Sequence, residues 1–154
     1  MARLSSLASV ADTRAVLDRF GLSTKKSLGQ HFLINDGVVE RICNLAELSH
    51  ADRVVEVGPG IGTLTEALLK RSGEVVSIER DTDLIEVLEE TCAPFSDTFS
   101  LISADALDVR AGELPFAPNK LVSNLPYAVA ATIVLDFFER FESLESATIM
   151  VQAE

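Results

Sequence analysis

The chain has 154 residues, of which 47% are apolar, and its formal net charge at pH 7 is −11. This length corresponds to one domain, and the apolar content is sufficient for a buried core, which excludes a disordered chain. The negative charge argues against a general nucleic-acid binder, because phosphate binding needs Lys and Arg to displace counterions.

Helix and strand patterns alternate along the chain. The predicted helices cover residues 13–20, 36–47, 63–71, 82–92 and 129–141. The predicted strands cover residues 52–57, 74–81, 99–103, 120–123 and 147–151. We expect Asp12 to cap the first helix and Gly21 to end it. The second helix has an expected apolar face made of Val38, Val39, Ile42 and Leu45.

The strands are continuous apolar runs, which is typical of a parallel sheet covered by helices on both faces. Ligands of such sheets bind beyond the carboxyl ends of the strands, where the strand order reverses. We therefore predict an α/β fold and expect the site residues at strand ends. The last strand lies close to residue 154, although a strand of this kind commonly needs a further neighbour or cover.

The ends and the thiols suggest an intracellular setting. No apolar run reaches the roughly 18 residues of a membrane helix, and residues 1–12 lack the apolar segment of a signal peptide, so we expect a cytoplasmic protein. Cys43 and Cys92 have no metal-ligand spacing and indicate reduced, partly buried thiols. Residues 1–32 hold five Lys or Arg and two Asp, so this arm is basic and the remainder is acidic. It is either a solvated surface or a basic lip that receives RNA.

Three glycines in five residues follow the first strand, in the stretch from Gly58 to Gly62. They allow a sharp turn and the close approach of a ligand, although glycines also simply make turns. The spacing differs from the dinucleotide pattern G-x-G-x-x-G, and Pro59 removes one amide donor from any anion cradle. Such a loop suits an uncharged or zwitterionic ligand better than a diphosphate.

Two carboxylates follow the next two strands. Glu79 ends the second strand, where a carboxylate can accept hydrogen bonds from ribose hydroxyls. Asp105 follows the third strand, where a carboxylate can accept from the amine of an adenine. Either residue can also be an ordinary surface or capping acid. Together with the glycines they predict a nucleoside pocket, and the glycine spacing favours S-adenosylmethionine.

The fourth strand runs into Asn124, Leu125, Pro126 and Tyr127 before an apolar helix. Taken alone, this stretch can be a strand-to-helix turn with Asn as a cap and Pro near the first helical position. The aromatic residues of the following helix are expected on its core face, and His50 in a surface loop. Those aromatic residues are Phe137, Phe138 and Phe141.

Five motifs in this order resemble the ribosomal RNA adenine dimethyltransferase family. They are KKSLGQHFLIN, VVEVGPGIGTLTEALL, SIERD, SADALDV and SNLPYAVAATIV, and they cover nearly all of the chain from Thr24 onward. The resemblance implies a Rossmann-like class I S-adenosylmethionine-dependent methyltransferase fold. It implies dimethylation of N6 of two adjacent adenosines near the 3′ end of small-subunit ribosomal RNA, in ribosome biogenesis.

The resemblance also implies roles for particular residues. His31 and Leu33 would line the pocket over the methionine and sugar, with help from Gln30, while Asn124 would stand between S-adenosylmethionine and the target base. Gly58 would lie against the cofactor, Glu79 would hold the ribose and Asp105 the adenine. The expected cofactor site is completed by neighbouring motif residues, namely Glu56, Gly60, Arg80 and Ala106. No metal is expected.

The same resemblance suggests a division into a basic arm with a cofactor-lid motif, residues 1–35, and a methyltransferase domain, residues 36–154. Family members continue with two further strands and a small helical domain, so we expect an N-terminal fragment with weak cofactor binding and little turnover. Ala153 stands where relatives often have Lys.

In this interpretation the oxygens of Asn124 and Leu125 accept hydrogen bonds from the target amine, while Pro126 fixes the turn and Tyr127 stacks on the base. Three other functions remain open. One is methylation of large-subunit ribosomal RNA, and another is a non-catalytic assembly or transcription factor. The third is a nicotinamide oxidoreductase, which the alternating glycines disfavour.

Overall fold

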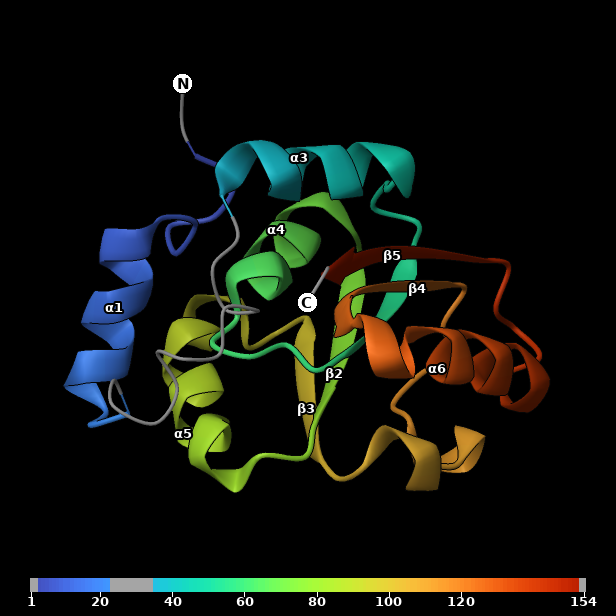
Figure 1. The fold of residues 1–154 in the computed structure, drawn as a ribbon. Helices are drawn as coiled ribbons and strands as arrows, with labels where there is room; N and C mark the ends of the chain where they lie inside the picture. Colours follow the sequence, from blue (N-terminus) through green and yellow to red (C-terminus); the bar gives the residue numbers. More distant parts are fainter. Residues whose placement is uncertain (1–2, 23–34, 153–154) are drawn as a thin grey trace.

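Continuous apolar runs form the strands of one parallel sheet, and the intervening segments fold back over its two faces (Figure 1). The computed structural model describes residues 3–22 and 35–152. Within them the strand order is β3-β2-β1-β4-β5, and every neighbouring pair is parallel. The strands are β1 Arg53–Val57, β2 Glu74–Glu79, β3 Phe99–Ser103, β4 Lys120–Pro126 and β5 Ser146–Gln152. The predicted α/β fold is confirmed.

Helices cover both faces of this sheet. The α-helices are α1 Val10–Arg19, α3 Asp36–Leu45, α4 Thr63–Arg71, α5 Thr82–Thr91 and α6 Tyr127–Arg140. The described part of the chain also has three single 3₁₀ turns that were not predicted, namely η2 Ala93–Phe95, η3 Ala106–Asp108 and η4 Ala111–Glu113. None of the helices in the described residues is long and apolar enough to cross a membrane.

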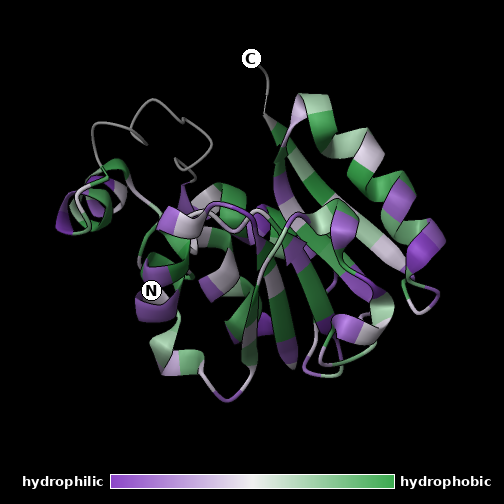
Figure 2. Ribbon diagram, turned by 90° about the horizontal axis from the view of Figure 1, so that it is seen from below, coloured by the Kyte–Doolittle hydropathy of each residue, from purple (hydrophilic) through white to green (hydrophobic). Residues whose placement is uncertain are grey.

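The core has two halves, one on each side of the sheet. Buried residues of α1, α3, α4 and α5 pack on one face, around side chains such as Val54 and Val75. Residues of α6 and η3, together with Val109 and Leu114, pack on the other face, around Val55 and Val76. Figure 2 shows the strands as largely hydrophobic between these two layers. The side chains of β1 and β2 therefore alternate between two separate apolar clusters.

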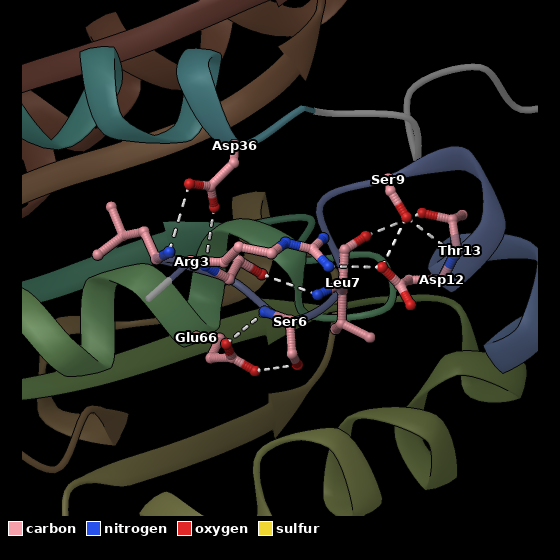
Figure 3. Close-up of polar contacts among 10 residues, drawn as sticks. Arg3, Ser6, Leu7, Ser9, Asp12, Thr13, Asp36 and Glu66 are labelled. Atoms are coloured by element: carbon pink, nitrogen blue, oxygen red, sulfur yellow. Dashed lines mark hydrogen bonds and ion pairs between the residues drawn. The ribbon is translucent and has the colours of Figure 1, made fainter. Parts of the chain in front are cut away.

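The first helix begins earlier than predicted. Ser9, and not Asp12, is the N-cap of α1, because the Ser9 hydroxyl accepts the Asp12 N–H at 3.0 Å and also donates to the Asp12 carboxylate at 2.6 Å (Figure 3). The predicted stop is confirmed. Gly21 has a φ of +71°, and its N–H bonds to Asp18 O after the last helical turn.

Two carboxylates hold the segment before α1, and they come from helices far along the chain (Figure 3). Asp36 accepts the N–H groups of Leu4 and Ser5 at 3.3 and 3.0 Å. Glu66 accepts the N–H and the hydroxyl of Ser6 at 2.6 and 2.7 Å. We call this segment, residues 4–7, the strap. Its last residue, Leu7, is buried. Residues 3–22 therefore pack on the same apolar cluster as α3, α4 and α5.

Replacement of Glu66 by alanine is expected to lower the free energy of unfolding by about 1–3 kcal/mol, because Ser6 loses a charged acceptor in a partly buried site. Chemical denaturation measures the change. Glu89→Ala is the matched control, since Glu89 is an exposed carboxylate on α5. Equal losses in the two variants would show that the strap does not contribute to stability.

Three further predictions from the sequence differ in detail from the structure. Leu45 is 68% exposed, because the buried stripe of α3 runs through Val39, Ile42 and Cys43 instead. Phe138 is 43% exposed, since it lies about 100° around the helix from Phe137, which faces the sheet. The fourth strand is longer than expected, and α6 begins directly after it.

Other expectations are confirmed. Phe137 and Phe141 are buried and pack edge to face, with 4.8 Å between the ring centroids. Cys43 and Cys92 are buried free thiols. His50 is exposed in the loop before β1, where its Nδ1 lies 3.2 Å from Ser72 O.

Candidate active site

A cavity of about 610 Å³ opens at the carboxyl edge of the sheet. Its polar and backbone walls come from the ends of β1, β2 and β4 and from the segment after β3. The strand order reverses between β1 and β4, and α/β sheets of this kind bind ligands outside the carboxyl ends of the strands at such a reversal. The predicted site residues that line it are Gly58, Gly60, Glu79, Arg80, Asp105, Ala106, Asn124, Leu125 and Pro126.

The glycine turn after β1 serves two separate purposes. Gly58 has a φ of +68°, and a Cβ added there would have no atom within 4 Å, so the backbone faces open space. Gly60 also has a positive φ, of 62°. A Cβ at Gly62 would lie 2.8 Å from the Thr91 hydroxyl of α5. Gly58 therefore lets a ligand approach, whereas Gly62 allows α4 and α5 to pack closely.

Glu79 links the glycine turn to the end of β2. Its Oε1 accepts the Gly60 N–H at 3.2 Å, and its Oε2 accepts the Asp81 N–H at 3.0 Å. Burial raises the pKa of this carboxyl group above its usual value. Each carboxylate oxygen can accept more than one hydrogen bond, so Glu79 can hold these amides and still receive hydroxyl donors from a ligand in the cavity.

Asp105 and Arg80 face each other at the ends of β3 and β2. Asp105 Oδ1 accepts the Leu107 N–H at 3.0 Å and so caps η3. Its Oδ2 lies 4.0 Å from Arg80 Nη1. Ala106 is buried beside them and lines the cavity. One oxygen of Asp105 is therefore occupied by the turn, and the other lies within reach of a charged group.

Glu56 is not brought into the cavity wall. It is 1% exposed and faces away from the α6 side of the sheet. Its Oε1 accepts the hydroxyls of Thr65 at 2.5 Å and Ser77 at 2.8 Å. Burial raises its pKa to about 7. A direct contact between Glu56 and a cofactor therefore has no support from the placement of this side chain.

The residues at the end of β4 have different positions. Asn124, Leu125 and Pro126 lie along the cavity wall, whereas Tyr127 begins α6 outside it and is 72% exposed. Pro126 has a φ of −61° and a ψ of 144°, which is the extended geometry that precedes the helix. Gln30, His31 and Leu33 lie outside the described residues.

Sequence reasoning missed one wall of the cavity. Val129, Thr132 and Ile133 of α6 line it. Their spacing of three and four residues places them on one helix face, directly after the Asn-Leu-Pro-Tyr stretch. This spacing was available in the sequence. The described residues hold no group of three His, Cys, Asp or Glu that could bind a metal ion.

This strand order, with a glycine turn after β1 and acidic residues after β2 and β3, defines a Rossmann-like fold of the class I S-adenosylmethionine-dependent methyltransferases. The family model described as ribosomal RNA adenine dimethylase matches residues 21–154. The chain belongs to the ribosomal RNA adenine dimethylase family, as its motifs predicted.

Individual relatives agree with this assignment. The chain is 41% identical over 147 residues to ribosomal RNA small subunit methyltransferase A of Dehalococcoides mccartyi (strain CBDB1), covering 94% of this chain and 50% of that protein. It is 42% identical over 154 residues to the protein of the same name from Nocardia farcinica (strain IFM 10152), covering 97% and 53%. The chain thus spans about half the length of the curated relatives it matches.

Solved structures share the fold. The 23S rRNA methyltransferase ErmE superposes with a TM-score of 0.67 and 31% identity over 77% of this chain and 46% of that one. A dimethyladenosine transferase from Plasmodium falciparum gives a TM-score of 0.65 at 24% identity, over 77% of this chain and 42% of that one. The predicted class I methyltransferase fold is therefore confirmed.

Proposed function

We propose that this chain carries the S-adenosylmethionine site and the catalytic loop of a ribosomal RNA adenine N6,N6-dimethyltransferase. Its substrate would be two adjacent adenosines near the 3′ end of small-subunit ribosomal RNA, methylated in the cytoplasm during ribosome biogenesis. The main support is that Glu79, Asp105 and Asn124, which come from or follow three different strands, line one cavity. The family assignment supports the RNA substrate.

The cavity, of about 610 Å³, has the volume of a small-molecule site, and its polar groups suit S-adenosylmethionine. Gly58 leaves open space where a side chain would otherwise obstruct a ligand. Glu79 provides acceptors for ribose hydroxyls, and Asp105 provides one for the adenine amine. By resemblance, Gln30, His31 and Leu33 would complete the pocket. When bound, S-adenosylmethionine supplies an electrophilic methyl group, and its transfer leaves the C–S electron pair on sulfur.

The catalytic work of the chain would lie at the end of β4. The N6 of adenine shares its lone pair with the ring and is a poor nucleophile until it becomes tetrahedral. The side-chain oxygen of Asn124 and the carbonyl of Leu125 would accept hydrogen bonds from the two N–H bonds and stabilise the positive charge that develops on nitrogen. The methylated nitrogen then loses its proton to water, so no general base is needed.

Pro126 and Tyr127 would position the base. Pro126 restricts the backbone of Leu125 to extended geometry, which presents the carbonyl in a fixed direction. Tyr127 is exposed next to the cavity and offers a ring for an extruded adenine, a contact worth about 1–3 kcal/mol per base. These two residues would therefore affect RNA binding more than cofactor binding.

Calorimetric titration tests the proposed cofactor class. S-Adenosylhomocysteine is expected to release or absorb heat and to saturate at one ligand per chain, whereas NAD is expected to give no saturable signal, because its diphosphate lacks the amide that Pro59 has removed from the turn. Tight binding of NAD, or no binding of S-adenosylhomocysteine to a folded sample, would contradict the proposal. Methylation of large-subunit RNA in preference to small-subunit particles would contradict the proposed substrate.

A further inference from the structure

Two buried carboxylates at the carboxyl edge of the sheet have no cationic partner among the described residues. Glu56 is 1% exposed and Glu79 is 6% exposed. Within the described part of the chain, neutral groups supply their hydrogen bonds: hydroxyls reach Glu56, and backbone amides reach Glu79. In residues 3–22 and 35–152, neither forms an ion pair with Lys or Arg. A buried charge without a counterion is costly, so this edge of the sheet favours any ligand that brings a positive charge.

The two carboxylates also influence each other. Burial raises the pKa of Glu56 to about 7, and the charge of Glu79 adds to this rise. Glu79 lines the cavity, and Glu56 directly precedes Val57, which also lines it. Glu56 therefore acts on the cavity through its electric field, because its side chain is covered by Thr65 and Ser77.

Few other ionisable groups surround this pair. The thiols of Cys43 and Cys92 feel the charge of Glu56, but burial raises their pKa values to about 11 and about 12, so both stay neutral near pH 7. Asp81 raises the pKa of Glu79 further. Arg80 is directed to Asp105 at the mouth of the cavity. Among these described groups, Glu56 is the one whose pKa lies near neutral pH.

We propose that Glu56 and Glu79 make the cavity selective for the charge of its ligand. They would bind the S-adenosylmethionine cation more tightly than the neutral thioether product, and they would couple binding of the cation to proton release. This inference rests on the proposed function. The methionine and nucleoside parts are common to both ligands, so the difference reports the sulfonium charge alone.

The direction of the pH effect follows from linkage. Below pH 7 the free protein carries a proton on Glu56, and a bound cation favours the charged form, so this proton leaves on binding. Affinity for S-adenosylmethionine therefore rises as the pH approaches 7 and becomes constant above it. S-Adenosylhomocysteine has no sulfonium charge and is expected to bind with almost no pH dependence.

Calorimetry with both ligands tests this. Between about pH 6 and pH 8 the affinity for S-adenosylmethionine is expected to rise about threefold to tenfold, and that for S-adenosylhomocysteine to stay within about twofold. Titrations near pH 6.5 in two buffers of different ionisation enthalpy count the protons. We expect roughly half a proton or more to leave with the cation, and almost none with the thioether.

Glu56→Gln is the informative variant, since it keeps the size of the side chain and removes its charge. It is expected to abolish proton release, to flatten the pH dependence and to lower the preference for the cation about threefold. Its affinity for S-adenosylhomocysteine is expected to stay within about twofold of the parent chain. Glu86→Gln removes an exposed charge from α5 and should leave all four quantities unchanged.

The possible failures can be told apart. Equal pH responses of the two ligands, or unchanged proton release in Glu56→Gln, would overturn the selectivity while leaving the proposed function in place. Absence of binding by both ligands at every pH would overturn both. If Glu56→Gln does not fold, as judged by circular dichroism, the proton counts of the parent chain with the two ligands still decide the question.

Discussion

Replacement of Asn124 by alanine is expected to lower the rate of methyl transfer by about 10²–10³-fold, the usual loss when one group that stabilises developing charge is removed. Asn124 lies on the cavity wall near the end of β4. Its amide oxygen would be the acceptor nearest to the amine of the target adenine. Because this contact strengthens only as nitrogen becomes positive, the variant should lose rate more than it loses cofactor affinity.

Transfer of a tritiated methyl group to small-subunit particles measures this rate. The chain is assayed both alone and joined to the second half of the Nocardia farcinica relative, whose length this chain covers to 53%. Asn44→Ala is the matched control, since Asn44 is an exposed carboxamide on α3 that does not line the cavity. The affinity of Asn124→Ala for S-adenosylhomocysteine should fall less than about tenfold. Undiminished transfer by this variant would remove Asn124 from the proposed mechanism.

Replacement of Glu79 by alanine is expected to weaken S-adenosylhomocysteine binding by about 10–100-fold. The proposed ribose acceptors would be lost, and hydrogen bonds to a charged group are worth about 1.5–3 kcal/mol. Removal of the carboxylate also leaves the N–H groups of Gly60 and Asp81 without the acceptor that Glu79 provides, at 3.2 and 3.0 Å. The glycine turn would therefore lose a support at the same time as the ligand loses a partner.

Calorimetry or equilibrium dialysis measures the loss, and a comparison of two substitutions separates its causes. Glu79→Gln keeps one acceptor oxygen and should recover part of the affinity, whereas Asp83→Ala, an exposed acid in the first turn of α5, should bind like the parent chain. If Glu79→Ala binds with unchanged affinity, the ribose does not lie against the end of β2.

The parts of the fold that sequence predicted well are bounded by residues with strong local preferences. Helix α4 starts directly after Gly62 and β3 precedes a turn, and both have the predicted bounds. The errors occur where tertiary contacts decide the boundary. The start of α1 depends on the hydroxyl of Ser9, and β4 continues through Pro126 because β5 pairs with it to the end.

The candidate site was predictable to the extent that strand ends meet at one edge of a parallel sheet. This rule brought Gly58, Glu79 and Asp105 together. It did not give the direction of each side chain. Glu56 falls between two valines that face α6, so the alternation of the strand turns it to the opposite layer. That α6 would supply a wall depends on how the helix packs, which no single motif shows.

The strap before α1 has a consequence for how this region can change over time. Asp36 and Glu66 bind mainly peptide N–H groups, which almost every amino acid has. These hydrogen bonds therefore depend little on which side chains the strap carries. Substitution of Leu4 by another apolar residue should therefore leave the strap bound to α3 and α4. Proline is the exception, because its ring nitrogen carries no hydrogen. One substitution to proline in the strap would remove an N–H group that these carboxylates accept, although most other substitutions there would be tolerated.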